Sequence, residues 1–145
     1  MKAAFGGIAN LVFVVVFFTI AIGALGLTVS YSKAFHMKSA IIQTIEEYEG
    51  AGCFGAGVVT SACRERIRKE AQRLTYNPPD LRCPSGYTKT DNFCYAKKDS
   101  TYRNGKKTTV VTVLVQVDLD FPVIEQITSW KIFRVAGDTK EIKMQ

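Results

Sequence analysis

The chain has 145 residues, and its 19 Lys and Arg outnumber its 13 Asp and Glu, which gives a formal net charge of +6. This length leaves room for one modest globular domain beside a membrane span and excludes a protein of several large domains. The single histidine leaves no Ser–His–Asp or Cys–His set, so we expect neither an enzyme nor a bound cofactor.

The most apolar stretch is Ile8 to Val29, which reads IANLVFVVVFFTIAIGALGLTV and carries no charge. As a helix it would be about 33 Å long, enough to cross the roughly 30 Å hydrocarbon core of a bilayer. We predict a transmembrane helix over residues 8–29, after a short cytoplasmic end at residues 1–7. One alternative is a secretory signal cleaved after Ala34. Another is a buried helix of a soluble protein, which the remaining polar chain would not easily surround.

Small side chains gather in the second half of this stretch. Small residues let membrane helices approach one another closely, and here they are candidates for helix packing: Ala21, Gly23, Ala24 and Gly26. The alternative is the glycine that is common in any membrane helix. Besides membrane lipid, the expected partners are further copies of the chain or similar subunits, bound through residues 8–29.

The next stretch, residues 31–49, reads YSKAFHMKSAIIQTIEEYE and contains neither Pro nor Gly. Its apolar residues recur at steps of three and four, which predicts an amphipathic helix that continues the first one as a single rod. The apolar stripe of this helix consists of Ile41, Ile42, Ile45 and Tyr48. We expect this stripe to cover one face of the sheet predicted later in the chain. Glutamates crowd the last turn of this helix, where the helix dipole disfavours negative charge, so other groups must stabilise that end.

Residues 50–59 form a glycine-rich loop, and residues 61–75 predict a second helix. Its thin apolar stripe is Ala62, Ile67, Ala71 and Leu74. The most basic part of the chain lies on the same helix and is a candidate polyanion-binding face: Arg64, Arg66, Arg68, Lys69 and Arg73. The alternative is a solvated helix whose basic residues pair with Glu65 and Glu70.

After residue 80 the apolar pattern changes to a period of two, which predicts a small antiparallel sheet over about residues 87–144. A hairpin is expected to turn at Asp91-Asn92, and another turn at Gly137-Asp138. The clearest strand runs from 108 to 121, with alternate valines on one face and, facing water, Gln116, Asp118 and Asp120. The expected fold class is α+β, with the outer part of the long helix packed on this sheet.

The four cysteines are Cys53, Cys63, Cys83 and Cys94. Their even number in a small domain predicts disulfides, and the local loops favour the sequential pairing of the first with the second and the third with the fourth. A zinc site is the alternative, although the gaps between the cysteines are wide for one. Because disulfides persist in oxidising compartments, residues 30–145 are expected outside the cytoplasm, on a single-pass membrane protein.

A long helix that is apolar and then amphipathic, laid on an antiparallel sheet with a disulfide-closed loop, resembles type IV pilins and pseudopilins. The segment from Trp130 to Ile142 is similar to the closing strand pair of the small tight-adherence-type members. The resemblance implies a structural subunit or accessory component of a surface filament or secretion-type assembly. Two features depart from it: Lys2-Ala3-Ala4-Phe5 is a poor processing site, and no acidic residue precedes Glu46. The alternative is a single-span protein whose basic outer domain binds a polyanion, a wall polymer or a partner protein.

Overall fold

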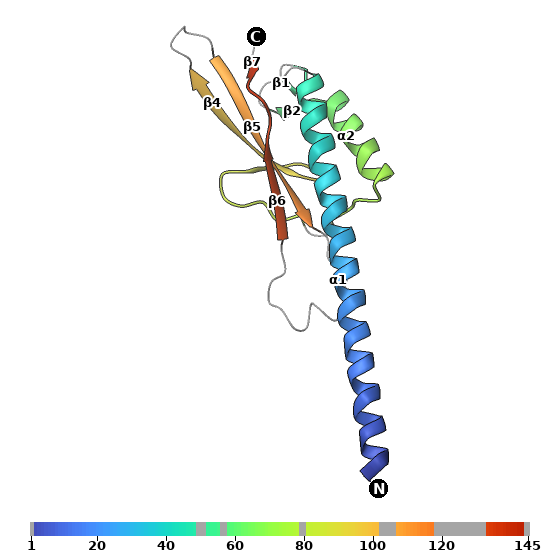
Figure 1. Cartoon of the computed structure of the whole chain (residues 1–145). Coiled ribbons are helices and arrows are strands. Elements are labelled where there is room, and N and C mark those ends of the chain that lie inside the picture. Colours follow the sequence, from blue (N-terminus) through green and yellow to red (C-terminus); the bar gives the residue numbers. More distant parts are fainter. Residues whose placement is uncertain are drawn as a thin grey trace.

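The computed structural model of the chain describes residues 2–48, 52–55, 58–78, 81–101, 107–117 and 133–143. The structure is α+β, with a long N-terminal helix against a small antiparallel sheet, so the expected fold class is confirmed. In Figure 1 the N-terminal half of the helix projects away from the sheet, and its C-terminal half lies beside it.

The long helix, α1, spans Lys2–Glu47 without a break, which confirms the predicted single rod. Its 46 residues correspond to a length of about 69 Å. The outer half packs on the sheet through residues at steps of three and four that are completely buried: Ala34, Met37, Ile41 and Ile45. Ile42 and Tyr48 are partly buried against the same core, so the apolar stripe covers the sheet as expected.

The main sheet is antiparallel throughout its described strands. These are β3 (Thr88–Lys89), β4 (Cys94–Thr101), β5 (Lys107–Val117), β6 (Phe133–Asp138) and β7 (Ile142–Lys143). Strands β3, β4, β5 and β6 lie side by side in that order, and β7 pairs with the beginning of β5. The turn between β3 and β4 falls at Asp91-Asn92, as expected.

Strand β5 carries the centre of the core. One face buries alternate valines in the cluster that also contains the outer half of α1: Val111, Val113, Val115 and Val117. On the opposite face Leu114 is buried with Leu81 and Cys94 in a second, smaller cluster. The alternation that predicted this strand therefore places an apolar layer on each side of the sheet.

The expectation that Gln116 faces water is wrong, because the chain that follows the second helix crosses this face of β5. The Gln116 side chain is buried. Its Oε1 accepts a hydrogen bond from the backbone N–H of Arg82 at 3.2 Å, and its backbone carbonyl accepts one from the Tyr76 hydroxyl at 2.6 Å. Asp118 and Asp120, predicted to face water too, lie outside the described residues.

The expected turn at Gly137-Asp138 is also wrong, since both residues belong to β6. An ideal Cβ on Gly137 would lie 2.8 Å from Cδ of Lys38 and 2.9 Å from Cδ1 of Ile42. Glycine at this position therefore lets α1 approach the strand closely. The chain leaves β6 at Thr139, whose N–H donates to the carbonyl of Val111 at 3.0 Å.

The second helix, α2, spans Ser61–Arg73 beside the outer half of α1 (Figure 1). It ends two residues earlier than predicted because Thr75 takes a left-handed conformation, with φ of 50°. Its buried residues are Cys63, Ile67 and Ala71, so Cys63 takes the place that we expected Ala62 to hold. Within the predicted loop at 50–59, β1 (Phe54–Gly55) pairs with β2 (Val58–Val59).

Two disulfides stabilise this arrangement and follow the sequential pairing expected from the sequence. Cys53–Cys63 joins the β1–β2 region to α2, and Cys83–Cys94 joins the chain before β3 to the start of β4. With sequence separations of 10 and 11, each contributes roughly 2.8 kcal/mol in the chain-entropy picture.

The acidic end of α1 is held by contacts with distant parts of the chain. Glu47 Oε2 lies 3.3 Å from Nη2 of Arg66 on α2. Glu46 Oε1 accepts a hydrogen bond at 2.9 Å from the backbone N–H of Lys140, between β6 and β7. These partners compensate for the unfavourable position of two carboxylates at a helix C-terminus.

Candidate functional site

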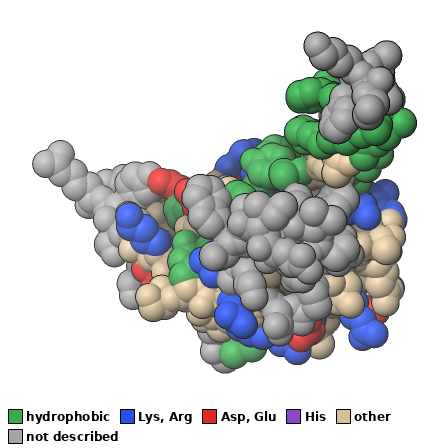
Figure 2. All heavy atoms as spheres, turned by 90° about the horizontal axis from the view of Figure 1, so that it is seen from below, with side chains coloured by type: hydrophobic (Ala, Val, Ile, Leu, Met, Phe, Trp, Pro, Cys, Tyr) green, Lys and Arg blue, Asp and Glu red, His purple; other side chains and the backbone are tan. Residues whose placement is uncertain are grey.

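The inner part of α1, residues 8–29, is called here the apolar segment. All its large apolar side chains are exposed, from 39% for Leu27 to 75% for Phe13. Figure 2, seen from below, shows hydrophobic side chains over the projecting part of the helix. Among the described residues, α1 is the one helix long and apolar enough to cross a membrane, and none of its apolar window is buried.

The polar side chains of the apolar segment do not need water to satisfy their hydroxyl groups. Thr19 donates a hydrogen bond to the carbonyl of Val15 at 2.9 Å, and Thr28 donates one to the carbonyl of Ala24 at 2.8 Å. Such bonds to the preceding turn are typical of Thr in helices that lie in apolar surroundings. The segment is therefore compatible with lipid or with a cover of apolar side chains.

The cost of leaving this surface in water is large. Burying one Val, Leu, Ile or Phe side chain contributes about 1.5–3 kcal/mol. The segment has fourteen such side chains. Because the helix already shields each by about half, together they amount to roughly 10–20 kcal/mol, which is comparable to or larger than the ~5–15 kcal/mol stability of a typical domain. Water is therefore an unfavourable surrounding for this segment.

The four small residues of the apolar segment do not share one face. At 100° per residue, Gly23 and Gly26 lie about 60° apart, whereas Ala21 lies about 160° from Gly23, on the other side of the helix. A Cβ added at Gly23 would meet no atom within 4 Å. The helix therefore divides the four candidates into two pairs on opposite sides, Gly23 with Gly26 and Ala21 with Ala24, and no contact within the chain requires glycine at position 23.

The basic residues of α2 are largely engaged with carboxylates. Arg66 pairs with Glu47 at 3.3 Å, Arg73 with Glu70 at 3.0 Å, and the Nε of Arg64 lies 3.8 Å from Asp91 on the turn before β4. Arg68 and Lys69 are exposed. Exposed ion pairs are worth little individually, about 0–1 kcal/mol, but they reduce the positive field that a polyanion would meet.

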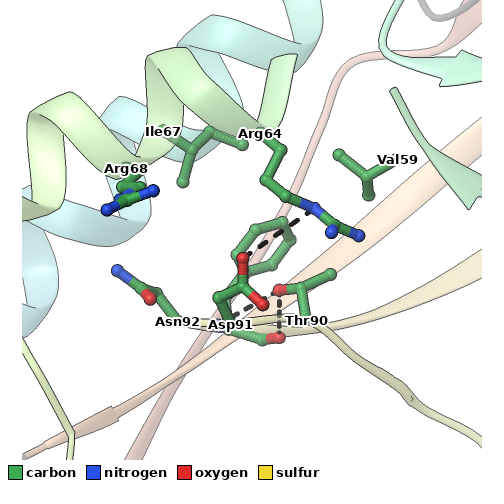
Figure 3. A pocket seen from close by; sticks show the side chains of 8 residues that line it. Val59, Arg64, Ile67, Arg68, Thr90, Asp91 and Asn92 are labelled. Atoms are coloured by element: carbon green, nitrogen blue, oxygen red, sulfur yellow. Dashed lines mark hydrogen bonds and ion pairs between the residues drawn. The ribbon is translucent and has the colours of Figure 1, made fainter. Parts of the chain in front are cut away.

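Figure 3 shows a small pocket between α2 and the turn before β4, with the Arg64 side chain directed toward Asp91. Its volume is about 10 Å³, which accommodates one water molecule and no larger ligand. An open groove of about 610 Å³ adjoins it, because Arg68, Asp91 and Asn92 line both. Amide, hydroxyl and guanidinium groups line this groove together with the Asp91 carboxylate, which lies 3.8 Å from the Nε of Arg64.

The cysteines and the histidine do not form a site together. Both disulfides engage the four thiols, so no thiolate remains to bind zinc, and the zinc alternative does not fit the structure. His36 is exposed on α1, away from the cysteines. In the part of the chain that the structure describes, no group of three His, Cys, Asp or Glu residues could hold a metal ion.

Two residues that hold the domain on the helix, Arg66 and Lys140, could not be recognised from the sequence. The glutamates at the end of α1 were expected to need partners, but their partners Arg66 and Lys140 were not identified. Both contacts join residues far apart in the sequence, and neither has a local signal. The apolar segment itself was identified from length and hydrophobicity alone.

One candidate membrane helix near the N-terminus and two disulfides in the C-terminal domain fit a single-pass membrane protein with an extracytoplasmic domain. The long apolar helix and small antiparallel sheet are loosely compatible with a pilin-like layout. Comparison with models of known protein families, with curated proteins and with solved structures found no match to this chain.

Proposed function

We propose that this protein is a membrane-anchored, pilin-like structural subunit or accessory component of a surface filament or secretion-type assembly. In this proposal the apolar segment packs among the helices of other subunits, and the disulfide-bonded domain faces outward. The segment is held in lipid before assembly and among neighbouring helices after it. The driving force for this assembly is the burial of the apolar side chains of the segment.

One observation carries this proposal. The same uninterrupted helix presents exposed apolar side chains on all sides in its inner half and is completely buried on one side in its outer half. A flexible linker would separate an anchor from its domain. A continuous rod instead fixes the position of the domain relative to the segment, as packing of repeated subunits requires.

The test is site-specific photocrosslinking in native cells, with a benzophenone amino acid at Phe13, Val14, Val15 or Val16. These consecutive positions point in four directions 100° apart, so together they sample every side of the helix. We expect covalent adducts to protein, either a second copy or another subunit, from at least one direction. Val58, exposed on β2 in the outer domain, is the control for random collisions.

Lipid adducts alone from all four positions, in cells that produce the assembled structure, would contradict the proposal. That result would leave a monomeric single-span anchor, whose outer domain would then have to carry the function. A second comparison uses Gly23→Leu and Ala21→Leu, which lengthen side chains on opposite sides of the helix; a Cβ at position 23 meets no atom of the chain within 4 Å. If the glycine face packs on a neighbour, only Gly23→Leu should reduce the yield of crosslinked dimers.

A further inference from the structure

The outer domain begins almost directly where the apolar segment ends. Ala34 is completely buried against the domain, and it lies only five residues, about 7.5 Å, beyond Val29. The headgroup layer of a bilayer extends about 5–7 Å beyond the hydrocarbon core on each side. If the apolar segment spans the core, the base of the domain must therefore lie at the headgroup layer.

Two aromatic residues of α1 lie near this height, on the side of the helix that faces β6. Tyr31 is about 3 Å and Phe35 about 9 Å beyond Val29 along the helix, and helical side chains lean back toward the N-terminus. Tyr31, Phe35, Lys38 and Ile42 follow steps of four, three and four, which place them on one face. Lys38 and Ile42 lie beside Gly137 of β6, so this face of α1 is the one that packs against β6. Tyr31 is 52% exposed and Phe35 46% exposed, although the ammonium of Lys38 lies 4.1 Å from the centroid of the Phe35 ring.

A third aromatic residue comes from the sheet. Phe133 is the first residue of β6, at the end of the strand nearest the projecting half of α1 (Figure 1). It precedes Gly137 by four residues, so both face α1, and it lies about 13 Å lower along the strand. That distance corresponds to about nine helix residues, from the level of Lys38 and Ile42 down to that of Tyr31.

These three residues, Tyr31, Phe35 and Phe133, are called here the aromatic base. Each of them remains about half exposed, whereas Ala34 and Met37, at similar heights on the neighbouring face of α1, are fully buried. Lys33, two residues from both Tyr31 and Phe35, and Arg134, the residue after Phe133, are also exposed. Aromatic rings with nearby cations are the side chains that membrane proteins place at the headgroup level.

We propose that the aromatic base rests in the phospholipid headgroup layer, with Lys33 and Arg134 reaching lipid phosphates. The outer domain is then seated on the membrane surface in one orientation rather than held above it on a free stalk. Lipid is the expected occupant because the base lies at the height where the bilayer surface must be. This inference rests on the membrane anchoring in the proposed function.

The test uses full-length protein in phosphatidylcholine vesicles that contain a lipid with a nitroxide on its headgroup. Trp130 is the only tryptophan of the chain, so Trp130→Phe provides a background for single reporters. Phe133→Trp and Phe35→Trp place a reporter in the aromatic base. Val58→Trp is the matched control, since Val58 is 59% exposed on the part of the domain far from the projecting helix.

We expect the nitroxide to quench both base reporters at least about twofold more strongly than the control, at protein dilutions where copies rarely meet. Using two reporters protects the test against misfolding of one variant, and peptide mapping of the disulfides verifies the fold of each. Equal quenching at all three positions, or quenching that appears only at high protein density, would overturn the inference.

Extraction with alkaline carbonate distinguishes two failures: the aromatic base not contacting the headgroup layer, and the apolar segment not anchoring the chain in the bilayer. If the chain stays in the vesicles while the reporters are quenched equally, the aromatic base does not contact lipid, although the anchor is intact. If carbonate releases the chain, the apolar segment does not span the bilayer, and both proposals are wrong.

Discussion

The end of α2 offers a substitution that should stabilise the protein. The helix closes with paired hydrogen bonds, from the N–H of Thr75 to the carbonyl of Gln72 at 3.1 Å and from the N–H of Tyr76 to the carbonyl of Ala71 at 2.9 Å. This is the Schellman arrangement, whose left-handed position usually holds glycine. Here it holds a β-branched threonine with φ of 50°, so we predict that Thr75→Gly increases the free energy of unfolding.

The magnitude follows from two opposing effects. A residue with a Cβ in the left-handed region costs about 1–2 kcal/mol, which glycine removes. Glycine also gives the unfolded chain more conformational freedom, which takes back about 0.5–1 kcal/mol. The Thr75 side chain is exposed, so little packing is lost, and the net gain should be about 0.5–1 kcal/mol.

Urea unfolding of the full chain in detergent micelles, with the disulfides intact and near-ultraviolet circular dichroism as the signal, measures this change. With a slope of about 1–3 kcal/mol per molar urea, the midpoint should rise by roughly 0.2–1 M. Gly86→Ala is the reciprocal control, because Gly86 has φ of 88° and open space at its Cβ position. It should lower the midpoint; a lower midpoint for Thr75→Gly would refute the reasoning.

Three further predictions use the same unfolding assay. Ile41→Ala should cost about 2–5 kcal/mol because the side chain is completely buried between α1 and the sheet; a cost below ~1 kcal/mol would mean that α1 is not docked there. Gln116→Leu should cost about 1–3 kcal/mol, since the N–H of Arg82 loses its acceptor, and no loss would contradict that bond. Burial lowers the pKa of Lys97 below 10.5, and the negative charge of Asp99 partly opposes this shift. The Lys97 ammonium therefore holds its proton more tightly in the unfolded chain than in the folded one. Stability should therefore rise with pH between the folded pKa and 10.5, and Lys97→Met should remove that rise.

Local patterns in the sequence predicted the elements that depend on local physics. The apolar segment, the stripe of Ile41 and Ile45, and the alternating valines of β5 each follow a period that fixes which side is buried. The short loops between cysteines favoured the disulfide pairing that the structure has. In these cases neighbouring residues carry the whole signal.

The errors arose where distant parts of the chain meet. Gln116 is polar and follows the alternation of a surface strand, but the chain after α2 crosses it and supplies its hydrogen-bond partners. Gly137 was interpreted as a turn residue, whereas its role is to admit the side chains of Lys38 and Ile42. A glycine needed for close packing and one needed for a turn look the same in a single sequence.

In the candidate site, too, the features formed by neighbouring residues could be predicted, and those formed by distant parts of the chain could not. The apolar segment is evident from composition, whereas the aromatic base combines α1 with the first residue of β6, about a hundred positions later in the chain. Similarly, the ion pairs of α2 with Glu47 and Asp91 could not be inferred from the basic stretch alone. The basic residues in the sequence indicated a positively charged surface on α2. In the folded chain, carboxylates from other elements partly neutralise its electrostatic field.

The most direct measurement is the intact mass of the protein recovered from the membrane or surface fraction of its native cells, alkylated with and without reductant. We expect a chain that retains residues 8–29 and whose four cysteines are alkylated only after reduction. A chain that begins after Ala34, or four thiols that react without reductant, would contradict the membrane-held rod with its oxidised outer domain.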